Sequence, residues 1–262
     1  MKKIASYVYL ALIAIFLYLP IGTLIILSFN SSKSMSIWTG FTLRWYIEMI
    51  HDRLIMNAIV NTFSIALISG IAATLIGTMA CIGLKSMLTR SQNILLGLNN
   101  IPLLNADIVT GISLMLCFLA FGISLGYSTI LISHITFCIP YVILSVRPRI
   151  NKTTESLYEA ALDLGASRLY AFRKVVIPEL APGIISGFLL SFTMSVDDFI
   201  ITYFTRGAGI NTISTRIYSE VKVGIRPSLF ALSTVVFSLA LIILIVVNLK
   251  IKSGEEREVE IF

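Results

Sequence analysis

The sequence predicts an all-α membrane protein with six transmembrane helices. Hydrophobic residues make up 56% of the 262 residues and charged residues only 13%. Mean hydropathy is +0.90. A soluble domain is nearer half apolar and a quarter charged. The apolar residues gather in six segments, each long enough to span a bilayer.

These six segments are expected to be helices, because inside a bilayer only a helix satisfies all of its own backbone polar groups. The first follows Met1-Lys2-Lys3, as the apolar part of a signal peptide would. It is, however, long enough to span a membrane, and no small-residue cleavage site precedes the next polar loop. We therefore expect a retained first helix. The predicted spans are residues 4–27, 55–84, 102–121, 128–146, 181–204 and 228–249.

The distribution of basic residues predicts that both termini lie in the cytoplasm. The segments then placed in the cytoplasm (1–3, 85–101, 147–180 and 250–262) hold 13 of the 20 Lys and Arg residues. Cytoplasmic loops carry such an excess, so the net charge of +6 need not indicate a nucleic-acid partner. The predicted organisation is a first transmembrane helix at 1–27, an extracytoplasmic loop at 28–54, a five-helix core at 55–250 with a cytoplasmic loop at 151–180, and a cytoplasmic tail at 251–262.

Residues 151–180 form a charged interruption between two apolar segments. Apolar and small residues recur at helical spacing from Leu157 to Leu164. Gly165 follows, where a helix commonly ends in a left-handed cap. A second short helix is expected to end near Pro178. Two short helices joined at Gly165 either pack beneath their own bundle or lie in the groove of a partner, and spacing alone leaves both open.

The order of residues in this loop resembles the EAA loop of ABC-importer permeases. The match consists of Glu159-Ala160-Ala161, Gly165 after three residues, and Val175-x-Ile177-Pro178 after nine more. The family pattern ends in Ile-x-Leu-Pro, so the chain departs from it only by Val for Ile and Ile for Leu. In that family the loop docks in a cleft of the ATPase subunit and transmits its movement. The resemblance implies that role here for Glu159, Ala160, Ala161, Gly165 and Pro178.

Four further segments look like the C-type permease of spermidine/putrescine importers, and the similarity covers almost the whole chain. These segments are residues 7–30, 132–138, 191–198 and 217–224. The resemblance implies a type I ABC importer permease fold, alternating access, and a place in the bacterial cytoplasmic (inner) membrane. It also implies a related B-type permease, two ATPase subunits and an extracytoplasmic polyamine-binding protein as partners. Membrane lipid would surround the helices, and no nucleic acid is expected.

Carboxylates inside the apolar segments are candidates for the path of a cation. An Asp at a helix centre costs about 2.5–3.5 kcal/mol on insertion scales, so it needs a reason. Asp107 lies early in the third predicted span, and Asp197 and Asp198 lie toward the outer end of the fifth. Acidic residues at these places also occur in the polyamine family. The alternative for each is a structural role, bonded to nearby hydroxyls or to a loop Arg.

Three other side chains are candidates for the same region. Ser195 offers a hydroxyl beside the two adjacent Asp residues. Trp45 is either an interfacial anchor or a ring face for a cationic substrate. His134, inside the fourth predicted span, is either a hydrogen-bonded residue of the bundle or a proton relay.

The sequence holds no motif for chemistry of its own. It has no Gly-x4-Gly-Lys-Ser/Thr phosphate loop, no catalytic Ser/His/Asp or Cys/His grouping and no metal-ligand cluster. We therefore expect a subunit that is not an enzyme and holds no cofactor, with ATP hydrolysis on another chain. Two alternatives stay open: an ABC permease for another small solute, and an ion-coupled secondary transporter, which should show inverted repeats and work alone.

Overall fold

The structure is a computed structural model that describes residues 2–34, 36–150, 152–239 and 241–242. Helices dominate this part of the chain, and a single isolated β-bridge joins Asn30 to Phe41. The chain divides into two compact units, one made of residues 1–56 and 217–262 and the other of residues 57–216. The predicted all-α class is confirmed.

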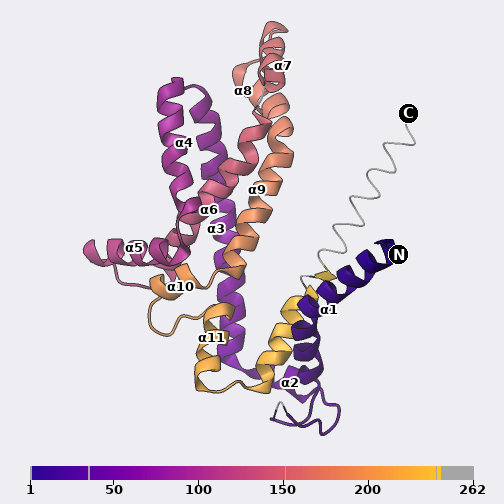
Figure 1. Cartoon of the computed structure of the whole chain (residues 1–262). Coiled ribbons are helices and arrows are strands. Elements are labelled where there is room, and N and C mark those ends of the chain that lie inside the picture. Colours follow the sequence, from indigo (N-terminus) through magenta and orange to yellow (C-terminus); the bar gives the residue numbers. More distant parts are fainter. Residues whose placement is uncertain (1, 35, 151, 240, 243–262) are drawn as a thin grey trace. The chain divides into compact units, whose positions relative to one another are not determined.

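Figure 1 shows the helices coloured along the chain. A 3-10 turn (η1, Arg147–Arg149) follows α6, a π-helical turn (η2, Phe172–Val176) joins α8 to α9, and an apolar helix at Pro227–Leu239 follows α11. The α-helices are α1 (Lys2–Ser28), α2 (Arg44–His51), α3 (Arg53–Lys85), α4 (Thr89–Leu104), α5 (Asp107–Ala120), α6 (Tyr127–Val146), α7 (Lys152–Asp163), α8 (Arg168–Ala171), α9 (Ile177–Asp197), α10 (Ile200–Thr205) and α11 (Ile213–Val223).

Four helices in the described part of the chain are long and apolar enough to cross a membrane. They are Ser6–Ser28, Arg53–Lys85, Tyr127–Arg149 and Arg168–Asp197, and they correspond to the first, second, fourth and fifth predicted spans. The shorter helix Pro227–Leu239 begins where the sixth was expected. Residues 240 and 243–249 of that span lie outside the described residues.

The prediction of one continuous helix for the third span, residues 102–121, is wrong. α4 ends at Leu104, α5 begins at Asp107, and the two helices are bent by 109°. Asn105 and Ala106 between them have extended backbones. Asn side chains compete with helical hydrogen bonds, and a carboxylate in the first turn favours a new helix start, so a break here is physically reasonable. Figure 1 shows α5 turned across the end of α4.

The fifth predicted span, residues 181–204, is also interrupted. α9 ends at Asp197, Asp198 is extended with φ −63° and ψ 131°, and α10 begins at Ile200. Asp197 and Asp198 therefore lie at the end of a helix and in a break. Their predicted position within a continuous helix is wrong.

Pro178 does not end a helix, contrary to the sequence prediction. α8, η2 and α9 form one helical run, Arg168–Asp197, and Pro178 lies near the start of α9 within it. In the wider η2 turn the Ile177 N–H donates to the Phe172 carbonyl, five residues back. Proline cannot donate the backbone hydrogen bond that an α-helix makes to the residue four positions back. A π-turn changes this hydrogen-bond pattern locally, because its bonds reach five residues back.

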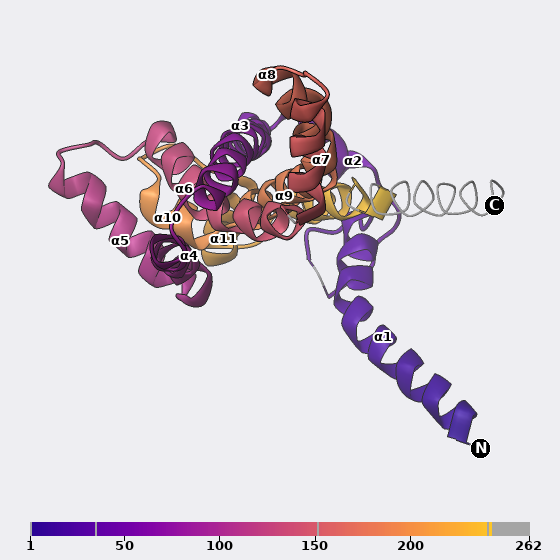
Figure 2. The same cartoon turned by 90° about the horizontal axis from the view of Figure 1, so that it is seen from above.

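In the unit of residues 57–216, glycines let α3, α6 and α9 approach closely, and Figures 1 and 2 show the three helices side by side. A Cβ on Gly77 of α3 would lie 2.8 Å from the Val142 Cβ of α6. On α9, a Cβ on Gly187 would lie 3.3 Å from the Val142 Cα, and one on Gly183 would lie 3.0 Å from the Ser145 carbonyl oxygen. Small residues four apart are a recurrent contact between membrane helices. This core positions the site.

In the other unit, α1 is apolar, and most of its described side chains are exposed. The segment after it folds around Asn30. The Asn30 amide nitrogen donates to the Ile37 carbonyl at 2.8 Å, and its side-chain oxygen accepts from the Ser32 and Thr39 N–H groups at 3.2 and 3.1 Å. An apolar helix with most of its described side chains exposed is suited to lipid or to another chain.

Candidate substrate cavity and coupling loop

Asp198 holds the break between α9 and α10. Its Oδ1 accepts from the Ile201 N–H at 3.2 Å, and its Oδ2 accepts from the Thr202 N–H at 2.8 Å and the Thr202 hydroxyl at 2.7 Å. The first N–H groups of a helix have no partner within that helix, and a carboxylate at this position satisfies them. Such a carboxylate matters more in an apolar span than in water, because lipid offers these N–H groups no hydrogen-bond acceptor.

His134 of α6 joins this break to α9 and α3. Its Nε2 lies 3.4 Å from the Asp198 Oδ2 and 2.9 Å from the Thr202 Oγ1. Its Nδ1 lies 2.6 Å from the Ser195 Oγ, which lies 3.2 Å from the Ser69 Oγ. The imidazole is 1% exposed and the Asp198 side chain 8%. Of the two roles predicted for His134, this geometry is that of a hydrogen-bonded residue of the bundle.

A cavity of about 300 Å³ opens next to this break, with walls from α5, α6, α9 and α10. All three candidate carboxylates, Asp107, Asp197 and Asp198, line it. Asp107 and Asp197 are exposed, whereas most of Asp198 is buried. The other lining residues are Phe137, Tyr141, Met194, Phe199, Ile200 and Ile201, so its described walls carry no Lys, Arg or His.

α5 reaches the cavity because Gly111 allows it to approach α10. A Cβ on Gly111 would lie 3.2 Å from the Phe204 ring and 3.4 Å from the Ile200 carbonyl oxygen. Asp107 stands four residues before Gly111, on the same face of the helix. The close contact of α5 with α10 therefore carries Asp107 to the same cavity as Asp197.

The cavity is suited to a cation. Its formal charge is negative, and carboxylates in a recess with apolar walls concentrate positively charged ligands. Phe137, Tyr141 and Phe199 supply aromatic rings, whose faces attract cations. Neither Asp107 nor Asp197 has a hydrogen bond or an ion pair with the described residues, so both carboxylates are available to a ligand.

Two predicted path residues lie elsewhere. Ser195 is buried and bonded to His134 and Ser69, and it is not among the residues that line the cavity. Trp45 belongs to the other unit and is only 3% exposed. Its indole N–H donates to the Asn30 carbonyl at 2.6 Å, and the Arg44 guanidinium lies 5.5 Å from the ring centroid. The structure thus gives both side chains a packing role.

The coupling loop turns at Gly165, as the sequence predicts. Gly165 has a φ of +85°, and a helix commonly ends at a glycine in this left-handed region. Its N–H donates to the Leu162 carbonyl at 2.9 Å, and the Ala166 N–H donates to the Ala161 carbonyl at 3.0 Å. These two bonds are the Schellman cap, which satisfies carbonyls that α7 leaves unpaired.

Most of the predicted coupling residues lie on the outside of this loop. Leu164 beside the turn is 90% exposed, and a Cβ on Gly165 would meet no atom within 4 Å. Apolar and small groups gathered at an open surface indicate contact with another chain. Figure 1 shows α7 and α8 beyond the first turns of α9. Of the predicted residues, Glu159, Ala160, Gly165 and Pro178 are exposed and Ala161 is half-buried.

Comparison with known families gives a direct match. Residues 110–251 match the family described as "Binding-protein-dependent transport system inner membrane component". The chain belongs to this family. It is therefore a multi-pass permease component of a transport system of the ABC importer class and not an enzyme, since ATP is hydrolysed by a separate subunit.

Similar proteins agree with this family. The chain is 37% identical over 230 residues to the spermidine/putrescine transport system permease protein PotC of Escherichia coli K12, with 88% of this chain and 87% of that protein covered. It is 38% identical over 228 residues to the putrescine transport system permease protein PotI of the same strain, with 84% and 81% covered.

Solved structures support the type I ABC importer permease fold. A bacterial ABC transporter involved in the import of the acidic polysaccharide alginate matches with a TM-score of 0.75 at 16% identity, covering 95% of each chain. The MetNI methionine ABC transporter matches with a TM-score of 0.60 at 16% identity, covering 76% of this chain and 94% of that one. At such identities the likeness shows the fold alone.

The sequence held an unused signal for part of this site. His134, Phe137 and Tyr141 recur at positions i, i+3 and i+7, which lie on one face of a helix. In the structure His134 joins the hydrogen-bonded break, while Phe137 and Tyr141 line the cavity. A polar and aromatic face on an apolar helix therefore indicates which side of α6 faces the cavity and the helix break.

Asp198→Asn is expected to destabilise the folded protein. An amide offers one acceptor oxygen where the carboxylate offers two, so a donor at the start of α10 loses its partner, at a cost of about 1–3 kcal/mol. Asp107→Asn is the matched control, because Asp107 is exposed and has no bond to break. The melting temperature of the purified protein should fall clearly more for Asp198→Asn than for Asp107→Asn, which loses only the charge–dipole interaction at the start of α5. Equal melting temperatures for both variants would show that the break does not depend on this carboxylate.

Proposed function

We propose that this chain is the permease subunit of an ABC importer that carries spermidine and putrescine into the cell. The observation that carries the proposal is the convergence of Asp107, Asp197 and Asp198 on one cavity with aromatic walls. Polyamines are flexible chains with two or more positive charges, and carboxylates with ring faces are the groups that bind such cations. The printed names of PotC and PotI support the same cargo.

The three carboxylates take different roles in this proposal. Asp107 and Asp197 bind the ammonium groups directly, because they are exposed and have no bonds to other described residues. Asp198 adds negative charge but keeps its place, since its oxygens already hold the start of α10 and lie near His134. The cargo is thus bound on one side of a fixed helix break.

Movement of the coupling loop has a direct mechanical route to the cavity. The helical run Arg168–Asp197 begins just after Gly165 and ends at the cavity wall. A helix transmits displacement along its axis better than a loop does, because each turn is bonded to the next. A rotation of α7 and α8 by an ATPase therefore shifts Asp197 and opens or closes the cavity.

The complete transporter in this proposal has several chains. A related B-type permease completes the path, two ATPase subunits bind the exposed coupling residues, and an extracytoplasmic polyamine-binding protein delivers cargo. Both termini lie in the cytoplasm and no cofactor is held in this chain. Residues 1–27 are the first transmembrane helix, 28–54 an extracytoplasmic loop, 55–250 the permease core with its coupling loop at 151–180, and 251–262 a cytoplasmic tail.

Asp107→Asn and Asp197→Asn are expected to weaken uptake of labelled spermidine in a strain that lacks its own polyamine importers. Each change removes a negative charge that faces the cargo, so KM should rise about tenfold, which corresponds to about 1.4 kcal/mol. The strain must express the partner subunits as well. Asp107→Glu is the control, because it keeps the charge and should keep most of the uptake.

Two results would count against this function. Wild-type KM in both Asn variants would remove the cavity from the cation path. If the complete transporter took up a neutral or anionic solute but no spermidine, the proposed cargo would be wrong. The assignment to the permease class would still stand.

Gly165→Trp is expected to separate the ATPase subunits from the permease. Trp and Ala at this position both take a left-handed backbone at a cost of about 1–2 kcal/mol, so Gly165→Ala controls for strain. Only Trp adds a large ring to the open face, where nothing in this chain obstructs it. Co-purification of the ATPase should fall about tenfold or more relative to the Ala variant. A tenfold loss of affinity corresponds to a steric penalty of about 1.4 kcal/mol. Wild-type co-purification and stimulated ATPase activity would contradict docking at this loop.

A further inference from the structure

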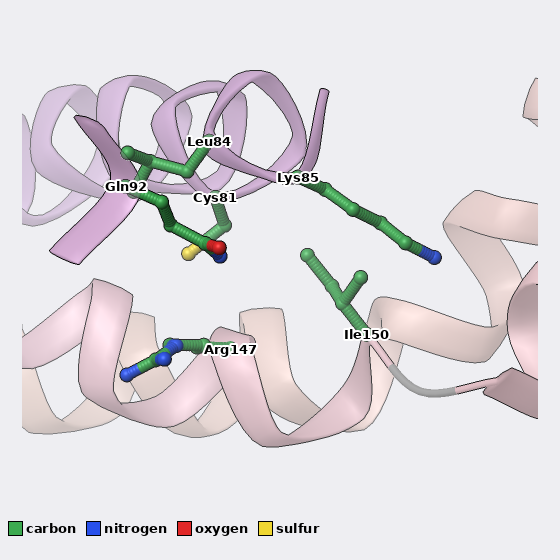
Figure 3. A pocket seen from close by; sticks show the side chains of 6 residues that line it. All are labelled: Cys81, Leu84, Lys85, Gln92, Arg147 and Ile150. Carbon is green, nitrogen blue, oxygen red and sulfur yellow. The ribbon is translucent and has the colours of Figure 1, made fainter. Parts of the chain in front are cut away.

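A second cavity, of about 190 Å³, lies where α3 and α6 end. Figure 3 shows Cys81, Leu84 and Gln92 on one side of it and Arg147 on the other. The apolar spans that form its walls, Arg53–Lys85 and Tyr127–Arg149, both end here. The cavity therefore lies at the level where hydrocarbon meets water. Its lining residues are Cys81, Leu84, Lys85, Gln92, Arg147 and Ile150.

The charged groups of this cavity are all positive. Lys85 and Arg147 line it together with the amide of Gln92, and its described walls include no carboxylate. The Arg147 guanidinium has no hydrogen bond or ion pair with the described residues. A guanidinium presents its donors in a planar fork that matches the oxygens of a phosphate. This end of the cavity is thus complementary to a phosphate group.

A larger, mostly apolar cavity of about 360 Å³ adjoins the first. The two have Lys85 and Ile150 in common in their walls. Apolar walls of this extent favour a hydrocarbon occupant over water. The remaining lining residues come from α3, α7, η2, α9 and the turn after α3: Ile82, Ser86, Tyr158, Phe172, Val176 and Leu180.

We propose that the two adjoining cavities bind one anionic phospholipid. The headgroup phosphate lies at Arg147 and the Gln92 amide, which Figure 3 shows at the same end of the cavity, with the Lys85 ammonium directed away from them. An acyl chain lies along Ile82, Phe172 and Val176. Charge complementarity selects an anionic headgroup, because a zwitterionic one brings its own cation next to the Arg147 guanidinium. Basic pockets between transmembrane helices at the cytoplasmic side are known to recognise such headgroups.

The position of this lipid gives it a role in coupling. Its chain touches η2, the π-helical turn in the run between the coupling loop and the substrate cavity. Its headgroup contacts α4 and the end of α6, which belong to the packed core. A bound lipid therefore fills the space beneath the coupling loop and braces η2 against the core.

Photo-crosslinking tests the site on the transporter purified with its partner subunits. The probe is phosphatidylglycerol with a diazirine in one acyl chain, added in trace amount to phosphatidylcholine nanodiscs, and adducts are mapped by mass spectrometry. Adducts are expected on the walls of the apolar cavity. Arg147→Gln should lower their yield about fivefold, since one basic residue near the surface contributes about 1 kcal/mol. Arg90→Gln is the matched control, because Arg90 is an exposed residue of α4 that lines neither cavity.

Ile82→Trp is an independent variant, since it fills the apolar cavity and leaves Arg147 in place. It should also lower the adduct yield. Equal yields from phosphatidylglycerol and phosphatidylcholine probes, or full yields in both Arg147→Gln and Ile82→Trp, would overturn the proposal. Loss of the adducts on addition of millimolar inorganic phosphate would assign Arg147 to a free anion and would overturn the lipid as well.

Discussion

The Asp198 carboxylate joins the start of α10 to His134 of α6, and the geometry of the substrate cavity depends on this interaction. A helix that breaks in apolar surroundings leaves backbone N–H groups that must find a partner. Asp198 accepts from two of them and from the Thr202 hydroxyl. The break lets α10 leave the axis of α9 and pack on α5 and α6. Only then do Asp107 and Asp197 line one cavity.

The carboxylates at this break also show how one short sequence serves two purposes. Asp197 and Asp198 are adjacent, yet one is exposed to the cavity and the other is bound into the fold. A buried carboxylate with several hydrogen bonds is costly to move, whereas an exposed one can exchange water for a cation. The rigid residue fixes the position of the ligand-binding residue beside it. The run from Gly165 to this break then links cargo binding to the coupling loop.

Local signals in the sequence predicted their structures well. Gly165 ends α7 because a left-handed cap needs only a few neighbouring residues, and the first, second and fourth spans follow from length and hydropathy alone. The helix breaks at Asn105 and Asp198 were not predicted from the sequence. Apolar residues continue on both sides of each break, and hydropathy carries no information about the direction of the backbone. Residues 85–101 were predicted only as a cytoplasmic segment, yet most of them belong to α4, because polar residues lower the hydropathy of a segment but not its capacity to form a helix.

The site was only partly predictable for a similar reason. The three Asp residues stood out because a charge in an apolar span is costly, but their different roles depend on contacts between helices far apart in sequence. Ser195 and Trp45 have side chains that could line a cation path. In the structure, however, the Ser195 hydroxyl is bonded to His134 and the Trp45 indole N–H to the Asn30 carbonyl. Residue type alone could not show which polar groups were already bonded.

We propose that this cavity holds the cargo on Asp107 and Asp197. A structure of the assembled transporter with spermidine bound tests it most directly. We expect ammonium nitrogens within hydrogen-bonding distance of both carboxylates, with Asp198 still bonded to Thr202. Spermidine bound at another place along the path, with this cavity empty, would contradict it.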